Sequence, residues 1–311
     1  MQSKEIIIII GPTASGKSYL GHCLAKKLGG EIVNCDSMQI YKQIPIITAS
    51  PSQMYLDEIP YHLYNFWPID KEFSVIKYLN VAHEKIQTIA CNQKIPIVIG
   101  GTGLYINSLL FGYNEIPTVD TDIRQHVRKL YDDLGKMDFF NKLKELDSIA
   151  GQKLNPGDTQ RVLRAYEVLL QTGKSIFSFQ SNKNINILPD FNYKVIFLYP
   201  ERNFLYQKCN ERLEKIFMKG AIEEVTKLHL EFPNLNSSAI KAIGVQEIIN
   251  YLEGKSSLQE ALKAAQMKTR QYAKRQITWF KNQIQDKITL EYSDIRQFEE
   301  LTFKLLKGFN V

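Results

Sequence analysis

A phosphate-binding motif follows the first apolar run of the chain. Isoleucines occupy positions 6–10, and Gly11, Gly16, Lys17 and Ser18 follow with the spacing Gly-x4-Gly-Lys-Ser. Such glycines let backbone N–H groups turn toward a phosphate, the lysine adds a positive charge, and the serine hydroxyl can ligate Mg²⁺. The alternative is a strand-to-helix turn that binds nothing, and the apolar strand directly before the motif argues against it. We therefore expect this segment to hold a phosphate or diphosphate.

Asp36 is the one carboxylate that directly follows a predicted core strand. The strands expected at 95–99 and 193–199 are directly followed by a glycine and by a proline, so neither supplies the acid that P-loop ATPases use to hold Mg²⁺. Because the carboxyl ends of parallel strands line the crevice of an open α/β sheet, Asp36 should lie beside the phosphate loop. Its position fits a general base and fits a turn residue equally well, since Asp-Ser is a common turn pair.

Two further features follow core strands. The Gly100–Gly103 turn contains Thr102, and it fits either a tight strand-to-helix turn or a close approach of the backbone to a ligand, with the Thr102 hydroxyl donating a hydrogen bond. Arg202 comes three residues after the strand expected at 193–199. A guanidinium group there can clamp a diphosphate through two hydrogen bonds, although a surface arginine at a helix start fits the spacing as well.

Basic residues concentrate near the C-terminus. Eight Lys or Arg residues lie at 255–287 against two acidic ones, an excess of six that equals the net charge of the whole chain, +6. Aromatic residues are interleaved with them on one long helical pattern, expected at 257–285. The basic face is either a solvated helix surface or a contact for a nucleic-acid backbone. Arg161 and Arg164, one helical turn apart, form a second basic pair.

Strands and helices alternate in a way that predicts an α/β fold. Apolar strands are expected at 6–10, 31–35, 95–99 and 193–199, with helices at 17–28 and about 74–91. The pattern is helical from about 117 to 189 and again from 199 to the end. We expect a P-loop NTPase-like core with a parallel sheet, an all-helical insertion domain and a helical C-terminal region. The predicted domains are 1–117 with 189–311, and 118–188.

Composition limits the class of protein. The chain has 311 residues, of which 44% are hydrophobic and 23% charged, as in globular proteins. Its four cysteines are far apart, which predicts reduced thiols and neither a disulfide framework nor a zinc site. The N-terminal apolar run is too short for a signal peptide, and no stretch is long enough to cross a bilayer. We expect a cytoplasmic monomer without a membrane partner.

Six ordered motifs resemble those of the tRNA dimethylallyltransferases, also called tRNA isopentenyltransferases. They run nearly from end to end and read GPTASGKS (11–18), DSMQIYK (36–42), IVIGGTGLYI (97–106), DTQRVLRAYEV (158–168), IKAIGVQEI (240–248) and TRQYAKRQITWF (269–280). The resemblance implies transfer of a dimethylallyl group from dimethylallyl diphosphate to the exocyclic amine, N6, of the adenine 3′ of the anticodon in tRNA, with Mg²⁺ as cofactor and the helical insertion gripping tRNA.

The resemblance also implies roles for individual residues. Asp36 matches the catalytic base, and Lys17, Ser18 and Arg202 complete the catalytic set, with Ser18 on the Mg²⁺ that accompanies the diphosphate. The diphosphate would be bound by Gly11, Pro12, Thr13, Ala14, Ser15, Gly16, Lys17, Ser18 and Arg202. With the basic C-terminal helix included, tRNA would be bound by Asp36, Ser37, Met38, Gln39, Thr102, Arg124, Gln160, Arg161, Val162, Leu163, Arg164, Lys241, Ala242, Ile243, Gly244, Val245, Gln246, Arg270, Lys274 and Arg275.

The chain departs from the family pattern at four positions. Ser18 replaces the more common threonine and keeps the hydroxyl. Ile47 and Ser50 stand where the family has glycine and lysine, and Tyr61 stands where it has the first histidine of a pair.

Three other functions compete with tRNA prenylation. They are a small-molecule or nucleotide kinase on the same core, a prenyltransferase acting on a free adenine nucleotide, and a nucleic-acid-binding ATP switch. The missing Mg²⁺-binding acid disfavours the last.

Overall fold

A parallel sheet organises the part of the chain that carries the phosphate-binding motif. The structure is a computed structural model that describes residues 4–180, 184–233, 235 and 237–309. Within these residues the sheet has six strands in the order β3-β2-β4-β1-β5-β6, and all neighbours pair in parallel. The strands are β1 (Lys4–Ile10), β2 (Glu31–Asn34), β3 (Tyr61–His62), β4 (Pro96–Gly100), β5 (Phe191–Pro200) and β6 (Ile288–Tyr292). The predicted fold class is confirmed.

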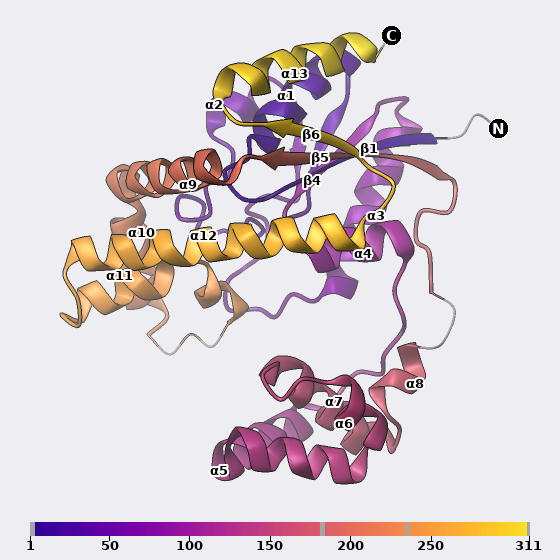
Figure 1. Ribbon diagram of the computed structural model, residues 1–311, viewed down its shortest axis with the longest axis vertical. Coiled ribbons are helices and arrows are strands. Elements are labelled where there is room, and N and C mark those ends of the chain that lie inside the picture. Colours follow the sequence, from indigo (N-terminus) through magenta and orange to yellow (C-terminus); the bar gives the residue numbers. More distant parts are fainter. Residues whose placement is uncertain (1–3, 181–183, 234, 236, 310–311) are drawn as a thin grey trace. The chain divides into compact units, whose positions relative to one another are not determined.

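Helices cover both faces of this sheet, which explains its uninterrupted apolar strands. Ile6–Ile10 of β1 are all buried, as expected for a central parallel strand covered on two sides. Helices α1 (Lys17–Leu28) and α13 (Ile295–Gly308) lie on one side, and α3 (Val75–Cys91), α4 (Gly103–Phe111) and α12 (Leu258–Gln283) lie on the other (Figure 1). The helices predicted at 74–91 and 257–285 are therefore confirmed, and each is capped by the serine before it.

Two strands were not predicted. The expectation of a purely helical chain after Tyr199 is wrong, because β6 pairs with β5 from Ile196↔Ile288 to Pro200↔Tyr292. β6 is an edge strand in which only Leu290 and Tyr292 are buried, so its sequence lacks the apolar run of a central strand. β3 is two residues long and is held by its pairing with β2.

The C-terminal half of the core adds a second group of helices. They are α9 (Arg202–Ile216), the π-helical segment Phe217–Ala221, α10 (Ile222–Glu231), the 3₁₀ segment Ser238–Lys241 and α11 (Val245–Leu252), and the short α2 (Gln53–Leu56) belongs to the N-terminal half. Helices α9, α10 and α11 and the segments between them bury a hydrophobic cluster with the segment that follows β2, including Tyr41, Ile44 and Ile47.

The chain divides into two units, Met1–Leu110 with Ile187–Val311, and Phe111–Asn186. The second unit contains α5 (Thr121–Leu146), α6 (Ser148–Lys153), α7 (Thr159–Thr172) and α8 (Ile176–Gln180). It has its own core, in which Phe139, Leu143 and Tyr166 are buried. Among the described residues, no helix in either unit is long and apolar enough to cross a membrane.

Candidate active site

The phosphate loop presents an open helix N-terminus. Gly16 caps α1 in the left-handed region, with φ 84°, and no side chain caps the helix there. The first N–H groups of a helix have no acceptor within the helix and carry its positive dipole end, so an anion is favoured at this point. Lys17 Nζ donates a hydrogen bond to Pro12 O at 2.7 Å, which brings the ammonium group back over the loop.

Glycine is required at both ends of the loop. A Cβ atom on Gly11 would lie 2.9 Å from the Leu198 carbonyl oxygen, and one on Gly16 would lie 2.7 Å from the Phe298 ring. Both residues also have a positive φ that other residues rarely adopt. The motif glycines therefore allow β5 and α13 to pack directly against the loop, a role that the motif alone does not reveal.

A cavity of about 710 Å³ opens on the phosphate loop. Its walls are the loop at Ala14–Ser18, the segment at 45–52 and one face of α9. Four cations line this face and the π-helical segment after it, at Lys208, Arg212, Lys215 and Lys219, against the single carboxylate of Glu211. The cavity is thus strongly positive. The spacing of these cations was visible in the sequence as a helical period, but nothing in it indicated that they face the loop.

Arg212 is the guanidinium group that the structure brings to the phosphate loop. Its Nη1 donates to Thr13 Oγ1 at 3.0 Å, and its Nη2 donates to Thr48 O at 3.3 Å. Burial lowers the pKa of Arg212, and the nearby Asp36 carboxylate offsets only part of this effect. Burial likewise lowers the pKa of Lys17 to about 8, with Asp36 acting in the opposite direction. Two desolvated cations therefore face the loop with a single carboxylate near both.

Asp36 lies beside the phosphate loop, as predicted. It is close enough to affect the pKa of both Lys17 and Arg212. Its Oδ1 accepts a hydrogen bond from the Met38 N–H at 2.9 Å, and its own N–H donates to Asn34 Oδ1 at 2.9 Å. The turn interpretation is therefore correct for one oxygen. Oδ2 makes no hydrogen bond within the described residues and is available for proton transfer.

The Gly100–Gly103 turn is used for packing. The Thr102 hydroxyl accepts from the Ser37 N–H at 2.9 Å and donates to Ser37 Oγ at 3.2 Å, so it ties this turn to the segment after Asp36. Cβ atoms on Gly101 and Gly103 would lie 2.3 Å from Gln276 Nε2 and 2.8 Å from the Trp279 ring. The tight-turn interpretation accounts for these two glycines, because side chains of α12 occupy the space that a ligand would need.

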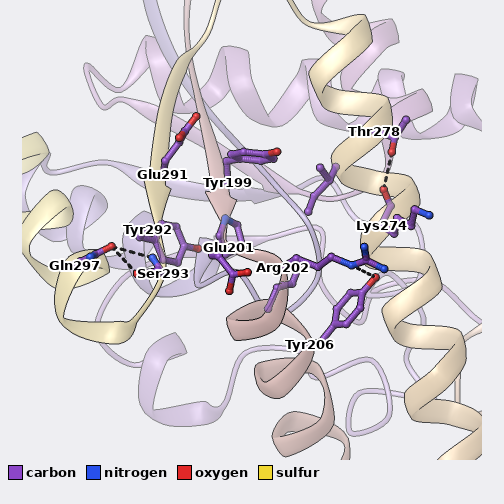
Figure 2. Close-up of a pocket in the computed structure, with 13 residues that line it drawn as sticks. Tyr199, Glu201, Arg202, Tyr206, Lys274, Thr278, Glu291, Tyr292, Ser293 and Gln297 are labelled. Carbon is purple, nitrogen blue, oxygen red and sulfur yellow. Dashed lines mark hydrogen bonds between the residues drawn. The ribbon is translucent and has the colours of Figure 1, made fainter.

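Arg202 is placed differently from the prediction. It lines a second cavity, of about 510 Å³, among whose lining residues none belongs to the phosphate loop. Figure 2 shows Arg202 reaching from the start of α9 toward α12, with Tyr206 and Lys274 beside its guanidinium group. Its Nε donates to the Tyr206 hydroxyl at 3.2 Å. This geometry favours Arg212, ten residues further along α9, for the role that the sequence assigned to Arg202.

The predicted tRNA-binding residues of the core divide into exposed and buried sets. Lys241, Gln246, Lys274 and Arg275 are exposed, whereas Ala242 and Val245 are in the hydrophobic core and Gly244 is buried as the N-cap of α11. Arg270 is half-buried and donates to Asn210 Oδ1 at 2.7 Å. Side-chain contact with tRNA is therefore excluded for Ala242 and Val245, because those side chains fill the core.

The basic pair in the second unit is unequal. The Arg161 side chain is 77% exposed and pairs with Asp158 at 3.1 Å. The Arg164 side chain is 34% exposed, pairs with Glu167 at 3.5 Å and donates to Pro117 O at 3.3 Å. Arg161 is free to reach a solvent-side partner, whereas Arg164 also holds its own unit together. Of the other residues predicted there, Gln160 is exposed, Leu163 and Arg124 are half-buried, and Val162 is in the core.

Two departures from the family pattern line or support the cavity. Ile47 is 5% exposed and packs in the core directly against Gly244. A Cβ atom on Gly244 would lie 2.6 Å from Ile47 Cδ1. Ser50 lines the cavity and donates to Asn65 Oδ1 at 2.9 Å. The segment is held by Glu224, whose carboxylate accepts from the N–H groups of Ile46 and Ile47 at 2.8 Å each. Ile47 is thus a packing residue, and Gln39 secures the same segment through Thr48 O and Ala49 O.

The loop also fits a diphosphate that carries a divalent cation. Ser18 is exposed in the first turn of α1, and the Ser15 hydroxyl is buried at the cavity without a hydrogen-bond partner in the described residues. No cluster of three acidic, histidine or cysteine side chains that would hold a metal ion is found among those residues. A Mg²⁺ ion at this loop would therefore depend on the Ser18 hydroxyl, water and the diphosphate oxygens, which is its usual mode at phosphate sites.

Known proteins similar to this chain share its architecture over nearly its full length. A family model described as IPP transferase matches residues 39–283. The tRNA dimethylallyltransferase of Rickettsia bellii is 60% identical over 305 residues, which cover 98% of this chain and 96% of the relative. That of Rickettsia felis is 59% identical over 301 residues, with 97% of each chain covered.

Solved structures also resemble this chain over nearly its full length, at lower sequence identity. A full-length tRNA isopentenylpyrophosphate transferase from Bacillus halodurans superposes with a TM-score of 0.70 at 30% identity, covering 98% of this chain and 95% of the other. A eukaryotic dimethylallyltransferase acting on tRNA superposes with a TM-score of 0.76 at 31% identity, covering 96% and 76%.

Proposed function

Because the chain belongs to the IPP transferase family, we propose that it transfers a dimethylallyl group from dimethylallyl diphosphate to an adenine of tRNA. The acceptor is the exocyclic amine, N6, of the adenine 3′ of the anticodon. The observation that best supports the donor is the pair of desolvated cations, Lys17 and Arg212, at an uncapped helix N-terminus. Burying cations costs free energy unless an anion joins them, and a diphosphate supplies that anion.

The residues support a single displacement at carbon. The bond between C1 of the dimethylallyl group and the diphosphate oxygen breaks, and a bond between N6 and C1 forms. Asp36 Oδ2 accepts the proton that N6 loses. Lys17, Arg212 and the first-turn N–H groups of α1 stabilise the charge that develops on the departing diphosphate. A Mg²⁺ ion held there with Ser18 would add to this stabilisation. No phosphoryl group moves, so the acid of P-loop ATPases is unnecessary.

The adenine must leave its stack to reach Asp36. Extruding a base costs about a few kcal/mol, and less where the base is already unpaired, as in an anticodon loop. We propose that the exposed cations of α12 and of the second unit contact tRNA phosphates and so offset this cost.

One assay separates this function from its alternatives. Dimethylallyl diphosphate labelled in the prenyl group is offered with tRNA, with a free adenine nucleotide, or with neither. Label in tRNA alone supports the proposal, and label in the free nucleotide supports the nucleotide prenyltransferase. A kinase or an ATP switch would leave the label in the diphosphate and hydrolyse or transfer phosphate from ATP instead.

Dimethylallyl diphosphate should bind less tightly as the pH rises above about 8. Lys17 has a pKa of about 8 without ligand, and a bound diphosphate must raise it by favouring the ammonium form. Affinity then begins to fall as the pH approaches 8 and drops by up to about tenfold per pH unit above it, until the pKa of the complex is reached. Titration calorimetry at pH 7, 8 and 9 measures this. Lys17→Met should bind weakly without that fall, and a flat wild-type profile would contradict the assignment.

Arg161→Ala should weaken tRNA binding and reduce its salt dependence. Each lost phosphate contact lowers the magnitude of the slope of log affinity against log salt by about 0.7–0.9. Arg161 is chosen over Arg164 because the latter also bonds to Pro117 and Glu167. Lys142→Ala removes an equal charge from an exposed position of α5 and serves as control. Filter binding over a salt series decides, and an unchanged slope would show that Arg161 is only solvated.

A further inference from the structure

Gln276 connects two loops of the active site from a distant helix. It lies in α12 and is 5% exposed. Its Oε1 accepts a hydrogen bond from the Thr13 N–H at 2.8 Å, and its Nε2 donates to Gly101 O at 2.9 Å. Thr13 belongs to the phosphate loop after β1, and Gly101 belongs to the turn after the neighbouring strand β4. One buried amide thus spans the carboxyl ends of two paired strands.

The orientation of this amide is determined by its partners. A backbone N–H can only donate and a carbonyl oxygen can only accept, so the oxygen of Gln276 must face Thr13 and its nitrogen must face Gly101. A carboxylate supplies acceptors only, and an aliphatic side chain supplies neither group. Among side chains of this length, glutamine alone satisfies both partners in the ionisation states found at neutral pH.

The turn is shaped to receive this side chain. A Cβ atom on Gly101 would lie 2.3 Å from Gln276 Nε2, so any larger residue at 101 would displace the amide. Gly101 is not among the residues with positive φ, so an alanine there meets only this steric obstacle. Gly101, whose role the sequence left open, is thereby explained by Gln276.

We propose that Gln276 is a positioning residue that holds the phosphate loop at a fixed position relative to the general base, Asp36. This rests on the proposed prenyl transfer. On one side, Gln276 holds Thr13, whose hydroxyl also accepts from Arg212. On the other side, it holds Gly101, and the adjacent Thr102 bonds to both the N–H and the hydroxyl of Ser37, the residue after Asp36.

Gln276 thereby fixes the distance between leaving group and base without touching either. A displacement of about 1 Å between reacting groups can reduce a rate by about 10²-fold. Removing the two hydrogen bonds of Gln276 should therefore lower kcat more than it weakens substrate binding, which is the signature of lost geometry in the transition state.

Gln276→Glu and Gln276→Leu test this positioning role in the full-length chain with tRNA and dimethylallyl diphosphate. Both should lower kcat by about 10–100-fold while the Kd for tRNA changes by less than about threefold. Gln276→Glu is nearly isosteric, and its melting temperature shows whether the fold survives. Gln283→Glu, the same change at an exposed position of the same helix, is the matched control and should leave kcat unchanged.

Gly101→Ala provides an independent test through a double-mutant cycle. In the wild type the new methyl group should expel the amide and lower kcat about as much as Gln276→Leu does. In a Gln276→Ala background the obstacle is gone, so Gly101→Ala should cost little further. Independent sites would instead give additive effects.

Two results would overturn the inference. The first is that both Gln276 variants keep a kcat within about threefold of the wild type. The second is that Gly101→Ala lowers kcat by the same factor in the wild type and in the Gln276→Ala background. The wild type serves as the reference for the proposed function. If it transfers no label to tRNA, the proposed function fails and this inference with it; if it is active and the variants are unaffected, only this inference fails.

Discussion

Replacing Asp36 by asparagine should lower the single-turnover rate of prenyl transfer to tRNA by about 10²–10⁴-fold, the usual contribution of a positioned general base. The substitution removes the proton acceptor at Oδ2 and keeps the shape of the side chain. Asparagine retains an oxygen that can accept from the Met38 N–H, so the turn after β2 should survive. Rapid quenching with saturating tRNA and labelled dimethylallyl diphosphate measures the rate directly.

Binding measurements distinguish a lost base from a lost site. The Kd for tRNA should change little in the Asp36→Asn variant, because the basic surfaces are not altered. The variant loses a negative charge beside Lys17 and Arg212 that would repel a diphosphate, so dimethylallyl diphosphate should bind at least as tightly as to the wild type. Asp70→Asn makes the same chemical change at an exposed position after β3 and should be as fast as the wild type. A near wild-type rate for Asp36→Asn with normal binding would show that another group, or water, accepts the proton.

Arg212→Met should weaken the binding of dimethylallyl diphosphate by about 30-fold or more. Losing one partner of a buried, hydrogen-bonded charge pair costs about 2–5 kcal/mol. The same change should not destabilise the free protein greatly, because burial already lowers the pKa of Arg212 and so opposes its charge when no anion is bound. Calorimetric titration with dimethylallyl diphosphate and a melting curve without it give the two quantities.

Arg202→Met is the matched control, because it removes a second guanidinium group from the same helix. Arg202 contacts Tyr206 in a cavity whose lining includes no phosphate-loop residue, so diphosphate affinity should change by less than about threefold. The opposite pattern, a large loss for Arg202→Met and none for Arg212→Met, would restore the assignment made from the sequence and refute the one made from the structure.

The sequence by itself determined the local parts of the active site. The phosphate loop is a contiguous strand, turn and helix start, so its geometry depends on residues 4–28 and is visible in their order. Asp36 was found because a residue that follows a parallel strand must lie at the carboxyl edge of the sheet. The helical nature of 121–180 and the long C-terminal helix follow from periodicity, which also needs only neighbouring residues.

Only the tertiary structure decided which distant residues complete the site. Arg212 and Gln276 lie 199 and 263 residues from Thr13, and no local pattern distinguishes them from nearby side chains such as Arg202 or Lys274. β6 was missed for a related reason, since an edge strand is stabilised by pairing with β5 more than by its own apolar residues. Local periodicity predicts which face of a helix is buried, but the packing of that helix on the sheet decides which residues this face contacts.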